Sequence, residues 1–242
     1  MQTIPITEVS EICNKLREGT PKSIKQVFGG DIHKSWQIEF NSAKFFLKRN
    51  ERKEKFLKFE ESCLKHLQQY VNYENLIIPK VICYLEVNNV ELLLMEWIDM
   101  QNFDQKNLGK GLGEMHLNSR ETNPKNFGYP IDGFIGLTDQ TKGWENNWID
   151  CFLNLRIIPQ LSILKSNFLD KETLDMVKEK IRSELLNHKP MNTLIHGDLW
   201  SGNVGIDKSG RGVIFDPASW WADNEVDIAM TKLFGGFGRE FY

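Results

Sequence analysis

The spacing of apolar residues predicts a chain whose first part is mainly strands and whose second part is mainly helices. Short apolar or alternating runs indicate strands, and Asn88-Asn89, between the last two runs, favours a tight hairpin turn; these runs cover 23–28, 36–40, 45–48, 81–85 and 90–95. Apolar residues recur every three or four positions from Lys53 to Tyr70, which predicts a long helix with one buried face. The same helical period appears near 7–18, 108–119, 144–158, 171–188 and 223–234. The pattern predicts an α+β protein with five strands in its N-terminal part.

Composition narrows the class of protein. The chain has 242 residues, of which 40% are hydrophobic and 26% charged, and this balance is typical of a folded protein. The net charge of −3, with no long basic block, argues against a nucleic-acid partner. The four cysteines lack the spacing of a zinc site, and no run has the length of a membrane span or the form of a signal peptide. We therefore expect a cytoplasmic protein that has a small-molecule partner and does not bind membranes.

The candidate chemistry is concentrated in one stretch, His196-Gly197-Asp198-Leu199-Trp200-Ser201-Gly202-Asn203. Asp198 precedes Asn203 by five positions, and a second carboxylate, Asp216, follows the β-type run 213–215. Phosphoryl transfer requires an aligned hydroxyl and charge neutralisation by Mg²⁺, which binds oxygen ligands. The pattern predicts Asp198 as the catalytic base, with Asn203 and Asp216 as metal ligands. Because a spacing of this kind also arises by chance, the motif alone does not identify a kinase.

Three further features match a nucleotide site, and each also has a plain structural interpretation. Gly29-Gly30, in the turn between the first two strands, can bring backbone N–H groups close to phosphates or can simply close a hairpin. Lys48 ends the third strand and can reach the α- and β-phosphates, although a lysine at such a place is often solvated. Glu60, on the helix that follows, can hold that lysine or can lie in solvent.

Together these motifs resemble the fructosamine kinase (ketosamine-3-kinase) family, related to the aminoglycoside phosphotransferases. The resemblance rests on HGDLWSGN at 196–203, IFDPASWW at 214–221 and LFGGF at 233–237. It implies a two-lobed protein-kinase-like fold, with a nucleotide-binding lobe at 1–97 and a catalytic and acceptor lobe at 98–242. It also implies that backbone groups of Glu96-Trp97-Ile98 bind adenine. Relatives continue for several dozen residues of helix, so the chain resembles a family member shortened at its C-terminus.

The activity that the resemblance implies is transfer of phosphate from ATP, with Mg²⁺, to the 3-hydroxyl of a ketosamine. The ketosamine would be of the fructosamine or ribulosamine type, free or formed on a protein lysine, and the outcome would be deglycation repair. Trp200, Trp220 and Trp221 can form an aromatic wall for the sugar ring or can fill the core. Two alternatives stay open: a phosphotransferase acting on an aminoglycoside or another small alcohol, and a pseudokinase that only binds nucleotide.

Overall fold

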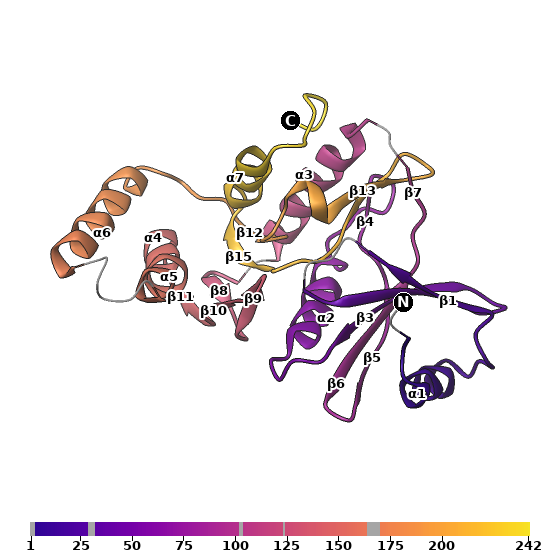
Figure 1. Cartoon of the computed structure of the whole chain (residues 1–242). Coiled ribbons are helices and arrows are strands. Elements are labelled where there is room, and N and C mark those ends of the chain that lie inside the picture. Colours follow the sequence, from indigo (N-terminus) through magenta and orange to yellow (C-terminus); the bar gives the residue numbers. More distant parts are fainter. Residues whose placement is uncertain (1–2, 29–31, 102–103, 123, 164–169) are drawn as a thin grey trace.

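The computed structural model describes residues 3–28, 32–101, 104–122, 124–163 and 170–242. A five-stranded antiparallel sheet forms the N-terminal part, in the order β1-β2-β3-β6-β5 (Figure 1). Its strands are β1 (Ser23–Val27), β2 (Lys34–Glu39), β3 (Lys44–Asn50), β5 (Val81–Val87) and β6 (Val90–Glu96). The five strands expected from the alternating runs are confirmed, including the hairpin at Asn88-Asn89, where both residues have positive φ.

Two helices pack against this sheet, α1 (Ile6–Leu16) and α2 (Phe56–Leu67). Alternate residues of β6 belong to different clusters: Leu92 and Leu94 pack with Ile12 of α1, whereas Leu93 and Met95 pack with α2. Since successive side chains of a strand point to opposite faces, the two helices cover opposite faces of the sheet. This double coverage explains why the middle of β6 is continuously apolar rather than alternating.

The C-terminal part is built from α3 (Lys106–Glu121), α7 (Glu225–Phe234) and two four-stranded sheets (Figure 1). One sheet has the order β11-β8-β15-β12, with bounds Gly143–Glu145, Phe127–Tyr129, Trp220–Asp223 and Asn192–Ile195. The other has the order β4-β14-β13-β7, with bounds Leu76–Ile77, Gly212–Ile214, Val204–Asp207 and Met100–Gln101. The remaining elements are the hairpin β9 (Gly133–Ile135) and β10 (Thr138–Gln140), then α4 (Trp148–Phe152), a π-helix (Leu153–Ile157), α5 (Ile158–Ile163) and α6 (Lys171–Leu185).

The expected helix beginning at Trp144 starts later than the pattern indicated. Trp144 lies in β11 and is exposed, whereas Trp148 begins α4 and is buried. A π-helix follows and ends two residues before Pro159. Because proline lacks an N–H and crowds the preceding turn, a change of helical geometry ahead of it is the expected adjustment.

The glycines of α3 allow close packing, as the small residues in its sequence indicate. A Cβ on Gly109 would lie 1.9 Å from the carbonyl oxygen of Phe241, and a Cβ on Gly111 would lie 2.5 Å from the Leu76 side chain. The helix can therefore approach both β4 and the C-terminal segment. One hydrophobic cluster runs from α2 through α3 to β12 and β15, and the boundary expected between 97 and 98 stays a prediction.

Candidate active site

The motif that contains Asp198 and Asn203 forms the loop between β12 and β13. Asn203 lies in a single 3₁₀ turn (Ser201–Asn203), and its Nδ2 donates to the backbone oxygen of Asp198 at 2.9 Å and to Oδ2 of Asp198 at 3.0 Å. The expectation that these two side chains meet in one loop is confirmed. Since the amide nitrogen of Asn203 faces Asp198, the amide oxygen, which is the atom that a metal ion would bind, is not engaged with Asp198.

The loop is held from behind by Asp227 on α7, whose side chain is fully buried. Its carboxylate accepts from the N–H groups of His196 at 2.8 Å and Gly197 at 2.9 Å, and His116 Nε2 lies 3.0 Å away. Gly197 has φ of 84°, and a Cβ there would lie 2.1 Å from the Ala218 carbonyl oxygen, so only glycine fits. His116 is thus a buried residue that contacts Asp227 behind the loop.

Asp216 follows β14 and has an unusual backbone conformation for a residue other than glycine, with φ of 59°. Such conformations are strained and cluster at functional sites, where they direct a side chain to a required place. Its Oδ1 accepts a hydrogen bond from Lys48 Nζ. The loop after β14 therefore contacts the N-terminal sheet through Asp216, which is the residue predicted as the second metal ligand.

Lys48 connects this loop to α2. Its Nζ donates to both carboxylate oxygens of Glu60, at 2.8 and 2.9 Å, which confirms the pairing expected between strand lysine and helix glutamate. Burial alone would lower the pKa of Lys48, but the charges of Asp216 and Glu60 outweigh it and raise the pKa above its usual value. Burial raises the pKa of Glu60 to about 7, helped by the negative charge of Asp216 and opposed by Lys48. One ammonium group is thus shared by two carboxylates.

A cavity of about 950 Å³ unites these groups. It is lined by every predicted site residue that the structure describes except two tryptophans, namely Lys48, Glu60, Glu96, Trp97, Ile98, Asp198, Trp200, Asn203 and Asp216. Its size is that of a small-molecule site. The predicted phosphate turn at Gly29 and Gly30 lies outside the described residues.

Asp198 is half-buried in the cavity wall, and burial raises its pKa above the usual value of an aspartate. The hydrogen bond from Asn203 acts in the opposite direction, while the charges of Asp216 and Asp227 add to the increase. A carboxylate of raised pKa is a better proton acceptor than an exposed aspartate. The arrangement can therefore orient a hydroxyl group and receive its proton late in a transfer.

The donor set fits a hard divalent cation. Asp216 offers carboxylate oxygens and Asn203 an amide oxygen, and both line the same cavity wall as Asp198. Mg²⁺ prefers oxygen ligands and binds through one or two carboxylates together with substrate phosphates. The residues present are those that such a site needs.

Two predicted substrate residues are corrected, because Trp220 and Trp221 lie in the core. They are 4% and 3% exposed in β15, which pairs with β8 on one side and β12 on the other. Trp220 stacks on Trp148, and Trp221 meets the rings of His66 and Tyr70 on α2. Both faces of the strand are covered, so neither ring can contact a sugar. Trp200 is half-buried and does line the cavity.

Several cavity residues were not predicted as site residues. His33 lines the cavity; burial and the charge of Lys48 lower its pKa to about 4, so its imidazole is neutral near pH 7. Phe56 and Phe59 of α2 and Met95 of β6 add apolar surface. Aromatic residues at helical spacing also fit a core face, so the sequence carried no signal that distinguishes the two roles.

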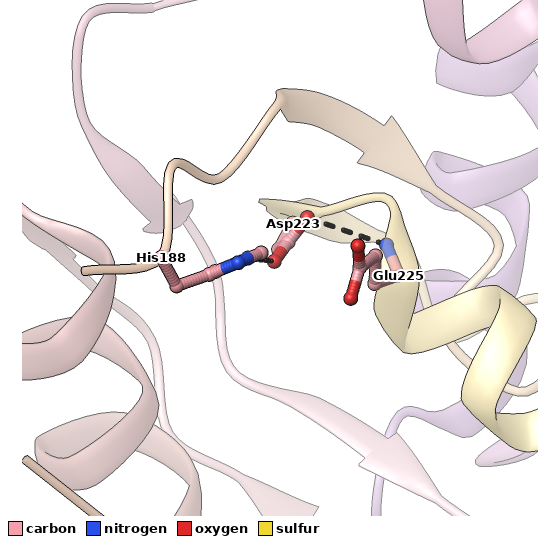
Figure 2. Close-up of side chains that lie close together, drawn as sticks. All are labelled: His188, Asp223 and Glu225. Atoms are coloured by element: carbon pink, nitrogen blue, oxygen red, sulfur yellow. Dashed lines mark hydrogen bonds and ion pairs between the residues drawn. The ribbon is translucent and has the colours of Figure 1, made fainter. Parts of the chain in front are cut away.

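A second group of metal-binding residue types lies outside the lining of this cavity, formed by His188, Asp223 and Glu225 (Figure 2). Asp223 accepts a hydrogen bond from His188 Nε2, and its other oxygen accepts from the backbone N–H of Glu225 at 3.3 Å. The Asp223 carboxylate is therefore engaged within the protein. These contacts tie the segment after α6 to the start of α7.

Comparison with known sequences gives a consistent family. The sequence profile of the fructosamine kinase family matches residues 6–242. A "probable ketoamine kinase" of Vibrio parahaemolyticus is 34% identical over 220 residues, covering 88% of this chain and 74% of the relative. One from Enterococcus faecium is 34% identical over 220 residues, covering 89% of this chain and 76% of the relative.

Solved structures show the same fold. A "putative fructosamine-3-kinase" from Haemophilus somnus has a TM-score of 0.83 at 23% identity and covers 97% of this chain and 79% of its own. A thermostable mutant of the aminoglycoside phosphotransferase APH(4)-Ia, in a ternary complex with ADP and hygromycin B, has a TM-score of 0.60 at 15% identity, and the match covers 93% of this chain and 75% of that one. The predicted kinase-like fold is thus confirmed.

Proposed function

The chain belongs to the fructosamine kinase family, and from this premise we propose that it transfers the γ-phosphate of ATP to the 3-hydroxyl of a ketosamine. The acceptor is of the fructosamine or ribulosamine type, free or on a protein lysine, and its phosphorylation serves deglycation. The observation that carries the proposal is the contact of Lys48 with both Glu60 and Asp216 in the cavity that also holds Asp198 and Asn203. We place the reaction in the cytoplasm, where ATP is available.

The nucleotide half of the cavity is the part beside β3, α2 and the segment after β6. Lys48, held by Glu60, steadies the α- and β-phosphates. Asn203 and Asp216 would hold Mg²⁺, which neutralises charge on the phosphates when bound. The N–H groups of Glu96 and Trp97 already donate to the carbonyl oxygens of Lys80 and Lys44. Adenine therefore binds to the other backbone N–H and carbonyl groups of the 96–98 segment.

The acceptor half lies beside Trp200 and the 134–137 segment. Asp198 accepts the hydrogen bond of the attacking hydroxyl and aligns it, and its main effect is positioning because an alcohol has a far higher pKa than a carboxyl group. Trp200, Phe134, Ile135 and Leu137 line the cavity with apolar surface that suits the C–H face of a sugar. A polycationic aminoglycoside would require carboxylates there, so this lining favours the ketosamine.

The test is phosphate transfer from ATP to ribulosamine, fructosamine and aminoglycoside acceptors, with the phosphorylated position read by NMR. We expect turnover on a ketosamine, phosphate on O3 and little turnover on aminoglycosides. Asp198→Asn is the matched control for contaminating kinases. Faster turnover of aminoglycosides would favour the second phosphotransferase assignment, and ATP binding without any transfer would favour a pseudokinase.

A further inference from the structure

Helix α2 carries Glu60 but has no N-terminal cap of its own. The residue at its N-cap, Lys55, makes no side-chain hydrogen bond to the helix, and the first turn contains no acidic residue. The first N–H groups of a helix lack partners within the helix and bear a partial positive charge. A helix that positions a functional side chain needs these groups satisfied from elsewhere.

The missing cap is supplied by Glu91, a fully buried residue of β6. Its Oε2 accepts from the backbone N–H of Leu57 at 3.2 Å, and its Oε1 accepts from that of Lys58 at 3.1 Å. These are the second and third residues of α2, where a cap side chain normally binds. Tyr84 OH adds a further hydrogen bond to Oε1, at 2.7 Å.

The same carboxylate also binds the strand that carries Lys48. Asn50, two residues after Lys48 in β3, pairs with Glu91 across the sheet and donates from Nδ2 to Oε2 at 2.7 Å. Asn50 Nδ2 also donates to the carbonyl oxygen of Glu54, at 2.8 Å, in the segment that leads into α2. One buried carboxylate therefore fixes both the strand that bears the lysine and the helix that bears its partner.

We propose that Glu91 is a positioning residue for nucleotide binding, which holds Glu60 in register with Lys48. Glu60 is one helical turn beyond Leu57, so a shift of the helix end moves its carboxylate against the lysine. Glu91 does not line the cavity, so it acts through Glu60: it fixes the register of the helix, and its charge adds to the rise in the Glu60 pKa. The inference rests on the phosphotransferase part of the proposed function and is independent of the identity of the acceptor.

The test combines Glu91→Gln with Glu60→Gln in a double-mutant cycle. Glutamine has the same shape but offers one acceptor oxygen and places an NH₂ group against donors. We expect the Kd of a fluorescent ATP analogue with Mg²⁺, and KM for ATP, to rise about tenfold in Glu91→Gln, which corresponds to about 1.4 kcal/mol. In the Glu60→Gln background the same substitution should change Kd by about twofold or less, because the carboxylate that Glu91 positions against Lys48 is then already absent.

Glu61→Gln is the matched control. Glu61 is another buried carboxylate of α2, but it pairs with Lys58 and Lys65 and does not line the cavity. We expect it to lower thermal stability while leaving the nucleotide Kd unchanged. Because the nucleotide Kd is measured without an acceptor, failure of the ketosamine assignment would leave this result intact.

Equal changes in Kd from Glu91→Gln with and without Glu60 would show that Glu91 acts independently of Glu60 and would overturn the proposal. An unchanged Kd in a folded Glu91→Gln protein would do the same. If that variant does not fold, Tyr84→Phe removes only one donor to Glu91 and should raise Kd about twofold to threefold, again only when Glu60 is present. Wild-type affinity in Tyr84→Phe would then decide against the proposal.

Discussion

Replacing Asp227 by Asn should uncouple the Asp198 loop from the helix behind it. Oδ2 of Asp227 faces both His196 N and His116 Nε2, and Oδ1 faces Gly197 N. An asparagine whose oxygen takes the Oδ2 place keeps the first two contacts and turns its NH₂ group against the N–H of Gly197. The substitution therefore removes one hydrogen bond to a charged acceptor and leaves a buried donor facing another donor.

The magnitude follows from this count. A lost hydrogen bond to a charged group and an unsatisfied buried donor together cost about 3 kcal/mol. For a chain of this length, that corresponds to a fall in the unfolding midpoint of about 6–12 °C. Gly197 directly precedes Asp198, and displacement of a reacting group by about 1 Å can cost about 10²-fold in rate. We expect kcat to fall by about 10-fold to 10²-fold, with KM for ATP nearly unchanged.

The assay compares thermal unfolding with kcat at a temperature where both proteins are folded. Asp223→Asn is the matched control, since Asp223 is another buried carboxylate near the start of α7, and its hydrogen bonds go to His188 and Glu225 rather than to the loop. We expect the control to lose stability and keep its kcat. A folded Asp227→Asn enzyme with normal kcat would refute the argument, as would an equal loss of kcat in the control.

Asp198→Asn should lower kcat by about 10²-fold to 10⁴-fold and leave ATP affinity nearly unchanged; near-normal turnover would exclude Asp198 as the base. Asp216→Asn should weaken Mg·ATP binding and be partly rescued by higher Mg²⁺ or by Mn²⁺, and a Mg²⁺ titration identical to that of the parent would exclude it as a ligand. Trp200→Ala should raise KM for ketosamines and lower kcat without changing ATP affinity, which steady-state kinetics with each substrate checks. The pKa of His33 is lowered to about 4 in the folded protein, so between pH 6.5 and pH 4 the unfolded chain binds a proton that the folded chain does not. The free energy of unfolding should therefore decrease as the pH falls through this range. In His33→Asn the decrease should be smaller by about 2 kcal/mol, as measured by urea unfolding.

The parts of the site that could be predicted from sequence were those whose residues lie close together along the chain, in short motifs. Asp198 and Asn203 are five residues apart in one loop, and Lys48 follows a short apolar run that predicts a strand, although β3 continues past it to Asn50. Their chemistry restricts which residue types can serve, so residue type and spacing are informative. The pairing of Lys48 with Glu60 followed from the resemblance to kinases, in which a helix glutamate holds the strand lysine.

The supports of the site could not be predicted, because each depends on a contact between distant parts of the chain. In the sequence, Glu91 is a charged residue near the start of a strand, where exposure to solvent would be expected, yet it is fully buried against α2. Asp227 lies in an amphipathic helix where a carboxylate normally faces solvent, and nothing local indicates that the 196–197 amides meet it. Trp220 and Trp221 were ambiguous for a related reason: their burial follows from the two neighbouring strands of β15, which no local pattern reveals.

None of the helices in the described ranges is both long enough and apolar enough to span a bilayer.

Glu91 and Asp227 make the same kind of contact at two separate places in the structure. Each is a buried carboxylate that accepts from two consecutive backbone N–H groups of the element carrying a functional side chain, Leu57 and Lys58 in one case and His196 and Gly197 in the other. A carboxylate can do this because both of its oxygens accept, and its charge strengthens each bond. An amide has one accepting oxygen and cannot satisfy the same geometry. The nucleotide side and the acceptor side of the cavity should therefore respond differently to neutral isosteres, with affinity for ATP lost at Glu91 and turnover lost at Asp227.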